Sequence, residues 1–418
     1  MRPEPHESSR PFAHAPARRL VVSNAFDAAS RNAVDLVIDT TAVIVVGAGA
    51  FQIGLLNAAG SIAFSLLGVP IGVLIDRADA RTAMTISAGA RALLCVGLAL
   101  LLASGQVTFW LLAAMSLLVG ISGAVSETGQ TVHATEVVPR GVVGTLVARL
   151  QSADSVLALA IPAVVGVALG AWAPEWSVGA AALASALAAV VLLGRRRATT
   201  RIRAGTAGPS RGRRPKGRFG AEVREGIAVF RSDAVLRRLT WSSALTNFGL
   251  AAFSSIATIL VLRTLDLGTA AYGLLVTLGA AGGLVGSLIA ARSTRRLSRA
   301  AVVSVATTAL ALVATIPLVA LWAEPAAFVL MGVHAVLWGL FIVLGNVQIA
   351  ALVAARVPHE KLGRVAAFRR SVTFSVVPVG GVLGGLVAGW LGIPSVVIGS
   401  IAASVLAAIL AWTARRGL

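Results

Sequence analysis

The chain has one cysteine, Cys95, two lysines and only 17 acidic residues among its 418. A lone cysteine excludes a disulfide framework and a metal site built from several cysteines. Neither lysine lies in a G-x-x-x-x-G-K-[ST] context, so the chain has no P-loop for nucleotide hydrolysis. An HExxH motif does not occur either. We therefore predict no enzyme activity, no cofactor and no bound metal.

What the chain has instead is apolar length. Hydrophobic residues make up 57% of it, and the mean hydropathy of +0.87 is too high for a soluble domain of this size. Several runs reach the roughly 20 residues that cross a bilayer. The predicted fold class is an all-α membrane protein with twelve transmembrane helices. They are placed at residues 18–46, 51–75, 82–103, 107–128, 142–170, 177–194, 239–262, 271–291, 299–321, 326–351, 363–390 and 393–412.

Basic residues fall almost entirely in alternate loops between these spans. Fourteen lie in the central loop, and three, Arg77, Arg81 and Arg91, are assigned to the loop near span 3. Only Arg31, inside span 1, and Arg263, on the opposite face, depart from the pattern. This asymmetry follows the positive-inside rule and predicts that both termini are cytoplasmic. It also explains the net charge of +19 without a nucleic-acid partner.

Arg outnumbers Lys 34 to 2, and together with abundant Ala and Gly this indicates a bacterial gene of high GC content. We therefore expect a multi-pass protein of the bacterial inner membrane. The predicted organisation is a cytoplasmic tail at 1–17, a six-helix bundle at 18–194, a basic cytoplasmic linker at 195–238, a second six-helix bundle at 239–412 and a tail at 413–418. The linker's polar first part is expected to be disordered. Phe219, Val223, Ile227 and Phe230 then predict a short amphipathic helix on the membrane surface.

The two halves repeat short motifs in the same order. Gly68-x-x-x-Gly72-x-Leu-Ile recurs as Gly282-x-x-x-Gly286-x-Leu-Ile, and a Val-Pro-x4-Gly segment at 138–144 recurs at 357–363. Glycines at this spacing let helix backbones approach closely. The repeat predicts a six-plus-six duplication with parallel halves.

The loop from Gly68 to Arg81, GVPIGVLIDRADAR, resembles the loop 2–3 signature of the major facilitator superfamily. The segments 137–148, 219–230 and 356–367 resemble the branch that contains macrolide-efflux proteins and the enterobactin exporter. One departure is the span 5 antiporter motif, G-P-x-x-G-G, which lacks its first and last glycine around Pro162. The resemblance implies two pseudo-symmetric six-helix bundles. It also implies a conformational latch formed by four residues: Gly72, Asp76, Arg77 and Arg81.

The function implied by this resemblance is secondary active transport by alternating access. We expect proton-coupled efflux of a hydrophobic or amphiphilic small molecule, such as a drug, antibiotic, siderophore or other metabolite. The expected partners are this substrate, protons and membrane lipids, and the chain is expected to act as a monomer. An importer or symporter and a lysolipid flippase of the same fold remain alternatives, as does a non-transporting membrane sensor or scaffold.

Span 1 carries four charged residues at steps of four: Asp27, Arg31, Asp35 and Asp39. Each step advances a helix by about 400°, so the four share one slowly turning face. Ionised residues at bilayer depth are costly, and we expect this face to line the central cavity. Our hypothesis is that Asp35 and Asp39 carry the coupling proton or bind a cationic substrate. Two alternatives are a solvated Asp27 at the cytoplasmic end and a purely structural pair of Arg31 with Asp35.

Further candidates come from other spans. Glu127, at the cytoplasmic end of span 4, and Asp154, on span 5, line the inner vestibule or bond to neighbouring loops and Arg149. In the second half, six polar and aromatic residues are candidates to line an amphiphile-sized cavity: Thr246, Asn247, Phe248, His334, Trp338 and Asn346.

Overall fold

The computed structural model describes residues 15–65, 67–77, 79–193, 230–294 and 297–416. All regular structure in this part of the chain is helical, which confirms the predicted all-α class. The residues form two compact units. The predicted amphipathic helix lies outside the described residues except for Phe230, and so does most of the basic linker.

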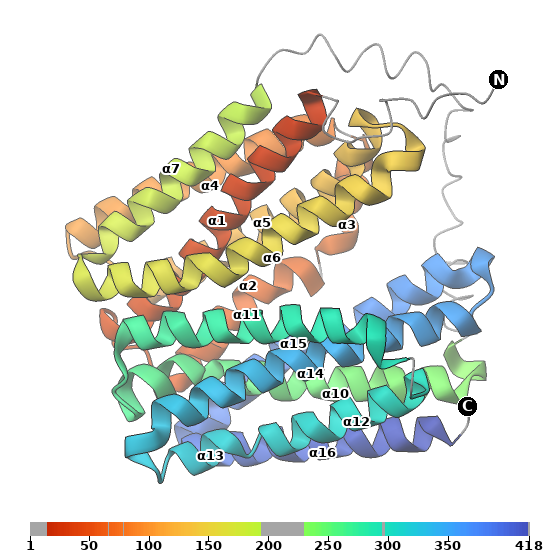
Figure 1. Cartoon of the computed structure of the whole chain (residues 1–418). Helices are drawn as coiled ribbons and strands as arrows, with labels where there is room; N and C mark the ends of the chain where they lie inside the picture. The colour runs from red at the N-terminus through yellow and green to blue at the C-terminus, as the bar shows by residue number, and fades with distance from the viewer. Residues whose placement is uncertain (1–14, 66, 78, 194–229, 295–296, 417–418) are drawn as a thin grey trace, which may run out of the picture. The chain divides into compact units, whose positions relative to one another are not determined.

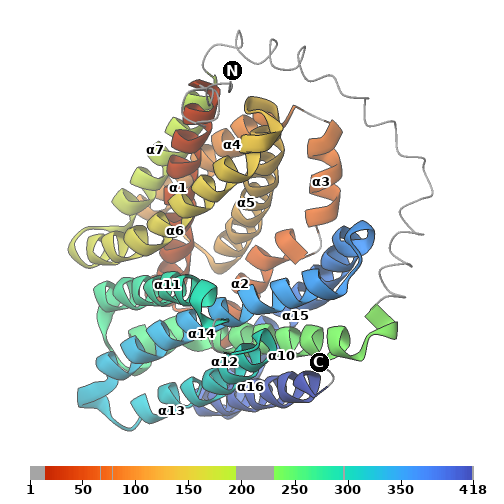
Figure 2. The ribbon, with the colours of Figure 1, turned by 45° about the vertical axis from the view of Figure 1, so that its right-hand side comes forward.

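The first unit comprises residues 1–41 and 62–212. Its helices are most of α1 (Ala15–Ile44), α3 (Gly68–Arg77), α4 (Ala80–Ala103), α5 (Phe109–Val137), α6 (Arg140–Ala171) and α7 (Pro174–Leu193), with the last four residues of α2. In Figure 1, α4 and α7 run side by side along their length. Figure 2 shows α3 as a separate short helix, and its contacts are with α5 and α4.

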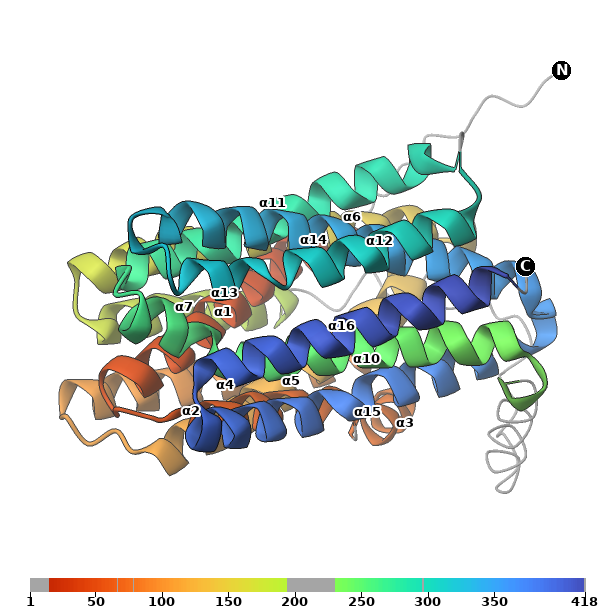
Figure 3. The ribbon, with the colours of Figure 1, turned by 90° about the horizontal axis from the view of Figure 1, so that it is seen from below.

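The second unit comprises residues 42–61 and 213–418, so it includes most of α2 (Ala50–Ser65). Its other helices are α10 (Ala234–Ile259), α11 (Gly268–Ser293), α12 (Arg299–Val313), α13 (Ile316–Ala320), α14 (Ala327–Arg356), α15 (His359–Leu391) and α16 (Ile393–Arg415). Figure 3 shows α10 between α15 and α16, both of which it contacts extensively. α11 packs mainly on α14.

Ten helices in the described residues are long and apolar enough to cross a membrane. The chain is therefore a multi-pass membrane protein. α1 is not among the ten, although its 30 residues would reach about 45 Å. The charged residues that it carries make it more polar than the other long helices. The count of twelve spans stays a prediction.

Two predicted spans are each divided into two helices. Span 2 becomes α2 and α3, and span 9 becomes α12 and α13. A proline follows each break: Pro70 lies in the first turn of α3 and Pro317 in the first turn of α13. Proline has no N–H to donate to the preceding turn, so it is tolerated in the first turn and disrupts a helix interior.

Several helices extend beyond the predicted spans. α5 continues to Val137, so Glu127 lies well inside this helix. Its predicted position was the end of span 4. α10 begins at Ala234, where the Asp233 carboxylate accepts hydrogen bonds from the N–H groups of Val235 (2.8 Å) and Leu236 (3.1 Å). Such a cap satisfies N–H groups that have no partner within the helix.

The predicted close approach of glycine-bearing helices is confirmed for α11 and α14. A Cβ atom at Gly282 would overlap the carbonyl oxygen of Val336, and one at Gly286 would overlap that of Leu340. Only glycine leaves room for another backbone here. At Gly72, in contrast, a Cβ atom would meet no atom of the described residues within 4 Å, so no such contact is seen at this glycine in the part of the chain that the structure describes.

Candidate functional site

The four charged residues of α1 that recur at steps of four differ in burial along the helix. The Asp27 side chain is 5% exposed, Arg31 and Asp39 are half-buried, and Asp35 is exposed. Burial is thus greatest at Asp27 and least at Asp35. Asp27 is not a solvated residue at the end of the helix, so that alternative is wrong.

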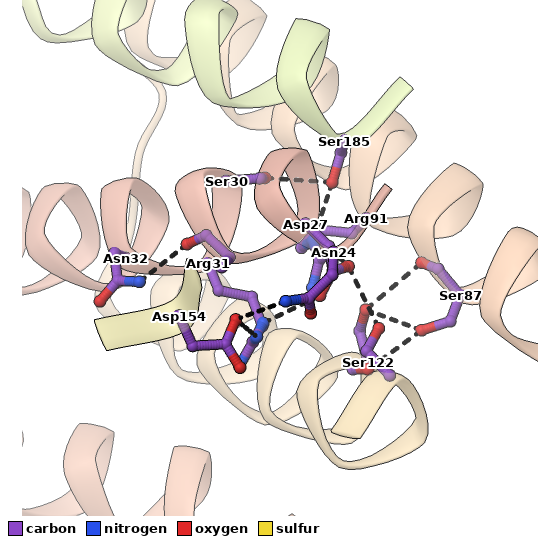
Figure 4. Close-up of polar contacts among 12 residues, drawn as sticks. Asn24, Asp27, Ser30, Arg31, Asn32, Ser87, Arg91, Ser122, Asp154 and Ser185 are labelled. Carbon is purple, nitrogen blue, oxygen red and sulfur yellow. Dashed lines mark hydrogen bonds and ion pairs between the residues drawn. The ribbon is translucent and has the colours of Figure 1, made fainter. Parts of the chain in front are cut away.

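Asp27 is held by three donors from three helices (Figure 4). The Arg31 Nε donates to Asp27 Oδ2 at 3.0 Å, and the Ser126 hydroxyl donates to Oδ1 at 3.1 Å. The Arg91 Nη2 also donates to Oδ1. Arg91 is completely buried, and its Nε donates to the Ser185 hydroxyl of α7 at 2.8 Å.

The structure corrects the assignment of Arg91 to a loop. Arg91 lies inside α4, among apolar residues on both sides. A positive charge at this depth is stable only when it is paired and hydrogen-bonded. The sequence did indicate this position, because the predicted span 82–103 contains Arg91. Assigning every basic residue near a span to a loop hid that indication.

Asp154 of α6 extends the network on the other side of Arg31. The Arg31 Nη2 lies 3.7 Å from Asp154 Oδ1, and the amide of Asn24 donates to the same oxygen at 3.0 Å. Arg31 thus pairs with Asp27 and Asp154, so the predicted structural pair of Arg31 with Asp35 is not observed. Two arginines and two aspartates balance in charge. Glu127 adds a like charge near Asp154.

Asp35 and Asp39 lie beyond this balanced network. Among the described residues, neither carboxylate has a hydrogen bond or an ion pair. α1 therefore carries two kinds of acid. Asp27 is neutralised by its ion pairs with Arg31 and Arg91. Asp35 and Asp39, further along the helix, have no ion-pair partner in the described part of the chain. Carboxylates without a fixed partner can accept a proton or a cation.

The six cavity candidates of the second unit do not form one lining. The Thr246 hydroxyl is buried and bonds to the Ser242 carbonyl of its own helix at 3.0 Å. The Asn247 amide donates to the Thr373 carbonyl of α15 at 2.9 Å, and the backbone of Phe248 lies against Gly380. Asn346 is exposed on α14. These contacts are chiefly packing between helices.

His334 and Trp338 belong to an aromatic row on α14. The His334 ring centroid lies 5.2 Å from that of Phe253 and 5.6 Å from that of Trp338. The His334 Nδ1 lies 3.0 Å from the Val313 carbonyl oxygen, so Nδ1 carries the proton. In a continuous helix this carbonyl would accept from residue 317, but Pro317 has no N–H. His334 thus satisfies the carbonyl that the break between α12 and α13 exposes.

This role makes a measurable prediction. We expect His334→Ala to cost about 1–2 kcal/mol more in the wild type than in a Pro317→Ala background, where residue 317 regains an N–H for Val313. Denaturant unfolding of the four proteins of this double-mutant cycle in detergent measures the difference. Equal costs in both backgrounds would show that His334 contributes only through its aromatic contacts.

Of the predicted latch, the structure describes mainly Arg81. Asp76 and Arg77 end α3, and their side chains lie outside the described ones. The Arg81 guanidinium donates to the Leu192 carbonyl at the end of α7, at 2.6 Å from Nε. A cation at a helix C-terminus is favoured by the carbonyl groups that have no helical partner.

The fold and the ten apolar helices define a polytopic membrane transport protein. The sequence profile of the Major Facilitator Superfamily matches residues 20–344, and the chain belongs to this superfamily. It is thus a transporter of a small-molecule substrate and not an enzyme. No curated protein matches the chain in sequence.

Solved structures with this fold are distant in sequence. A bacterial homologue of the iron transporter ferroportin, in an inward-facing state, is 15% identical with a TM-score of 0.73, covering 96% of this chain and 98% of that chain. The nucleoside transporter NupG is 12% identical (TM-score 0.71; 96% and 98% covered). The D-xylose-proton symporter is 14% identical (TM-score 0.69; 95% and 96% covered). At these identities the likeness shows the fold alone.

Proposed function

We propose that this chain is a proton-coupled exporter of a hydrophobic or amphiphilic small molecule. It would lie in the bacterial inner membrane with both termini in the cytoplasm, as the charge of the loops predicts. The observation that carries the proposal is the pair of aspartates Asp35 and Asp39, which have no hydrogen bond or ion pair among the described residues. They follow the charge-balanced network of Asp27, Arg31, Arg91 and Asp154 on the same helix. The resemblance to macrolide-efflux proteins supports the direction of transport and the class of substrate.

The proposed coupling uses the two kinds of acid in different ways. The network of Asp27, Arg31, Arg91 and Asp154 holds α1 on α4 and α6. Asp35 and Asp39 then gain and lose a proton as the cavity faces each side of the membrane. Protonation removes the negative charge that holds a cationic substrate, and the proton gradient restores the cycle.

The test is accumulation of a varied panel of compounds in a bacterium without its own pumps. We expect wild-type protein to lower accumulation of at least one compound, and an uncoupler to abolish the effect. Asp35→Asn/Asp39→Asn should behave as the empty vector, because the amides cannot carry a proton at these positions. Glu324→Gln, an exposed acid that precedes the predicted span 326–351, is the matched control and should match wild type. Export by the double variant that still stops with the uncoupler would refute the role of these aspartates.

A lysolipid flippase is the second candidate, favoured by an apolar groove of about 610 Å³ in the first unit. Its floor is Ala29 and Ala33 of α1, and its walls come from α6 and α7. Trp172 and Trp176, both exposed, lie at the turn between these walls. Transfer of a fluorescent lysolipid between leaflets of proteoliposomes, with no compound exported from cells, would favour this function over drug export.

A further inference from the structure

The outer ends of α1 and α2 belong to the second unit. The boundary between the units falls within α1, after Thr41, and within α2, after Ser61. Residues 42–61, here called the crossover segment, therefore come from the first half of the chain but pack with the second. The charge of the loops predicts that this segment lies on the extracytoplasmic side.

Arg263 fastens the crossover segment to α10. It lies in the π-helical turn Leu260–Thr264 that ends α10. Its Nη1 donates to the Ala48 carbonyl at 3.0 Å, and its Nη2 donates to the Val43 carbonyl in the last turn of α1. Carbonyl groups at a helix C-terminus lack helical donors and carry partial negative charge, so a guanidinium is a well-matched partner.

Glycine contacts hold the rest of the segment against α15. A Cβ atom at Gly385 would lie 2.5 Å from the Ala50 carbonyl oxygen and 2.8 Å from Phe51 Cα. One turn earlier, Gly381 faces Gly54. The amide of Asn57 donates to the Ser254 carbonyl of α10 at 3.2 Å. The crossover segment is thus held at one end by the two hydrogen bonds of the Arg263 guanidinium and along α2 by direct backbone contact with α15.

We propose that Arg263 is a positioning residue of the transport cycle, which holds the extracytoplasmic end of α1 on α10 and releases it when the cavity opens to the outside. Alternating access moves one half against the other, so contacts between elements of the two halves must break in one state. Val43 follows Asp39 by one helical turn, and the same helix therefore links the contact to the proposed proton site. The inference rests on the proposed transport function but not on its proton coupling.

The experiment reports accessibility of one cysteine from each side of the membrane. Cys95→Ala removes the native cysteine, and Ala58→Cys places a reporter at a buried position of the crossover segment, beside Gly381. A membrane-impermeant maleimide is applied to intact cells and, separately, to inside-out vesicles.

Two variants of Arg263 are compared. Arg263→Gln keeps hydrogen-bond donors without charge, and Arg263→Lys keeps the charge without the planar guanidinium that reaches two carbonyl groups. Asp266→Asn, three residues away, is the control, since asparagine tolerates the positive φ of 46° at this position.

In Arg263→Gln we expect external labelling to rise roughly tenfold or more, since charge-assisted hydrogen bonds are lost from the docked state only. Labelling from the cytoplasmic side should stay low, and the maximal transport rate should fall more than the apparent substrate affinity. Arg263→Lys should lie between, and Asp266→Asn should match wild type. Labelling that rises equally from both sides would show general loosening, and unchanged labelling would show that Arg263 holds nothing; either result overturns the proposal.

A second pair of variants tests the same docked state by another route. Gly385→Ala should raise external labelling as Arg263→Gln does, whereas Gly389→Ala, where a Cβ atom meets nothing within 4 Å, should not. Labelling of the reporter cysteine needs no substrate. The experiment can therefore contradict the positioning role of Arg263 without contradicting the export function, and the reverse. If no compound is exported but Arg263→Gln still exposes the reporter from outside only, the positioning role stands and the export function fails.

Discussion

Replacing Arg91 by methionine is expected to lower the free energy of unfolding by about 3–5 kcal/mol, because it leaves the buried Asp27 carboxylate with one of its two cations. Arg91 is fully buried and joins α1 to α7 through Asp27 and Ser185. Water does not reach this depth to solvate the Asp27 carboxylate in place of Arg91, so the carboxylate would be left in an apolar surrounding. Denaturant unfolding of the purified protein in detergent, followed by circular dichroism, measures the loss.

The control is the double variant Asp27→Asn/Arg91→Met, in which neither charge remains. Replacing both members of a buried pair by uncharged groups is often nearly neutral, so most of the lost stability should return. Arg31→Met should cost less than Arg91→Met, because the Arg31 side chain is 22% exposed and its contact with Asp154, at 3.7 Å, is longer than its contact with Asp27. If Arg91→Met unfolds as the wild type does, the buried pair contributes nothing to stability.

This network shows how far the sequence leads. The four-residue period of Asp27, Arg31, Asp35 and Asp39 predicted one charged face on one helix, and α1 has that face. The partners could not be predicted in the same way, since Arg91, Asp154 and Ser126 come from three other helices. Periodicity orders residues within a helix, but pairing between helices depends on their packing.

Helix breaks show a similar limit. The apolar runs predicted where helices lie, because burial in lipid requires length and hydropathy. Hydropathy does not depend on whether a residue has a backbone N–H to donate. The helix breaks near Pro70 and Pro317 therefore did not change the predicted spans. His334 was a cavity candidate because polar residues in spans are rare, yet the structure places its Nδ1 on the carbonyl that Pro317 leaves without a donor. The backbone explains this histidine, and its sequence neighbours do not.

The latch residues mark a third case. Asp76, Arg77 and Arg81 were assigned through resemblance, and of the three only Arg81 has a described contact, with the end of α7. Arg263 plays a comparable part at the end of α1, where it donates to the Val43 carbonyl. Each arginine donates to carbonyl groups at the C-terminus of another helix, which a sequence motif cannot reveal because the acceptors are backbone atoms. Counting charges by membrane face did, however, single out Arg263 as an exception.

Gly282→Ala is expected to destabilise the second unit by about 3 kcal/mol, near the upper end of the usual cost of overpacking. The added Cβ would overlap the Val336 carbonyl oxygen and lie 2.8 Å from its carbonyl carbon and 2.9 Å from its Cα. These are backbone atoms, so no side-chain rotation relieves the contact, and α11 must move away from α14. The repeated glycines on α11 are thus required by the distance between two backbones.

Gly279→Ala provides the comparison on the same helix and against the same neighbour. There the added Cβ would lie 3.7 Å from the Ala335 carbonyl oxygen, an ordinary van der Waals contact, and alanine favours the helix. We therefore expect Gly279→Ala to be neutral or slightly stabilising in detergent unfolding, while Gly282→Ala lowers both the midpoint and the folded yield. Equal effects of the two substitutions would mean that helix propensity, and not backbone contact, decides the stability of this helix pair. A selective loss at Gly282 would instead show that the direct backbone contact between α11 and α14 decides the stability of this pair.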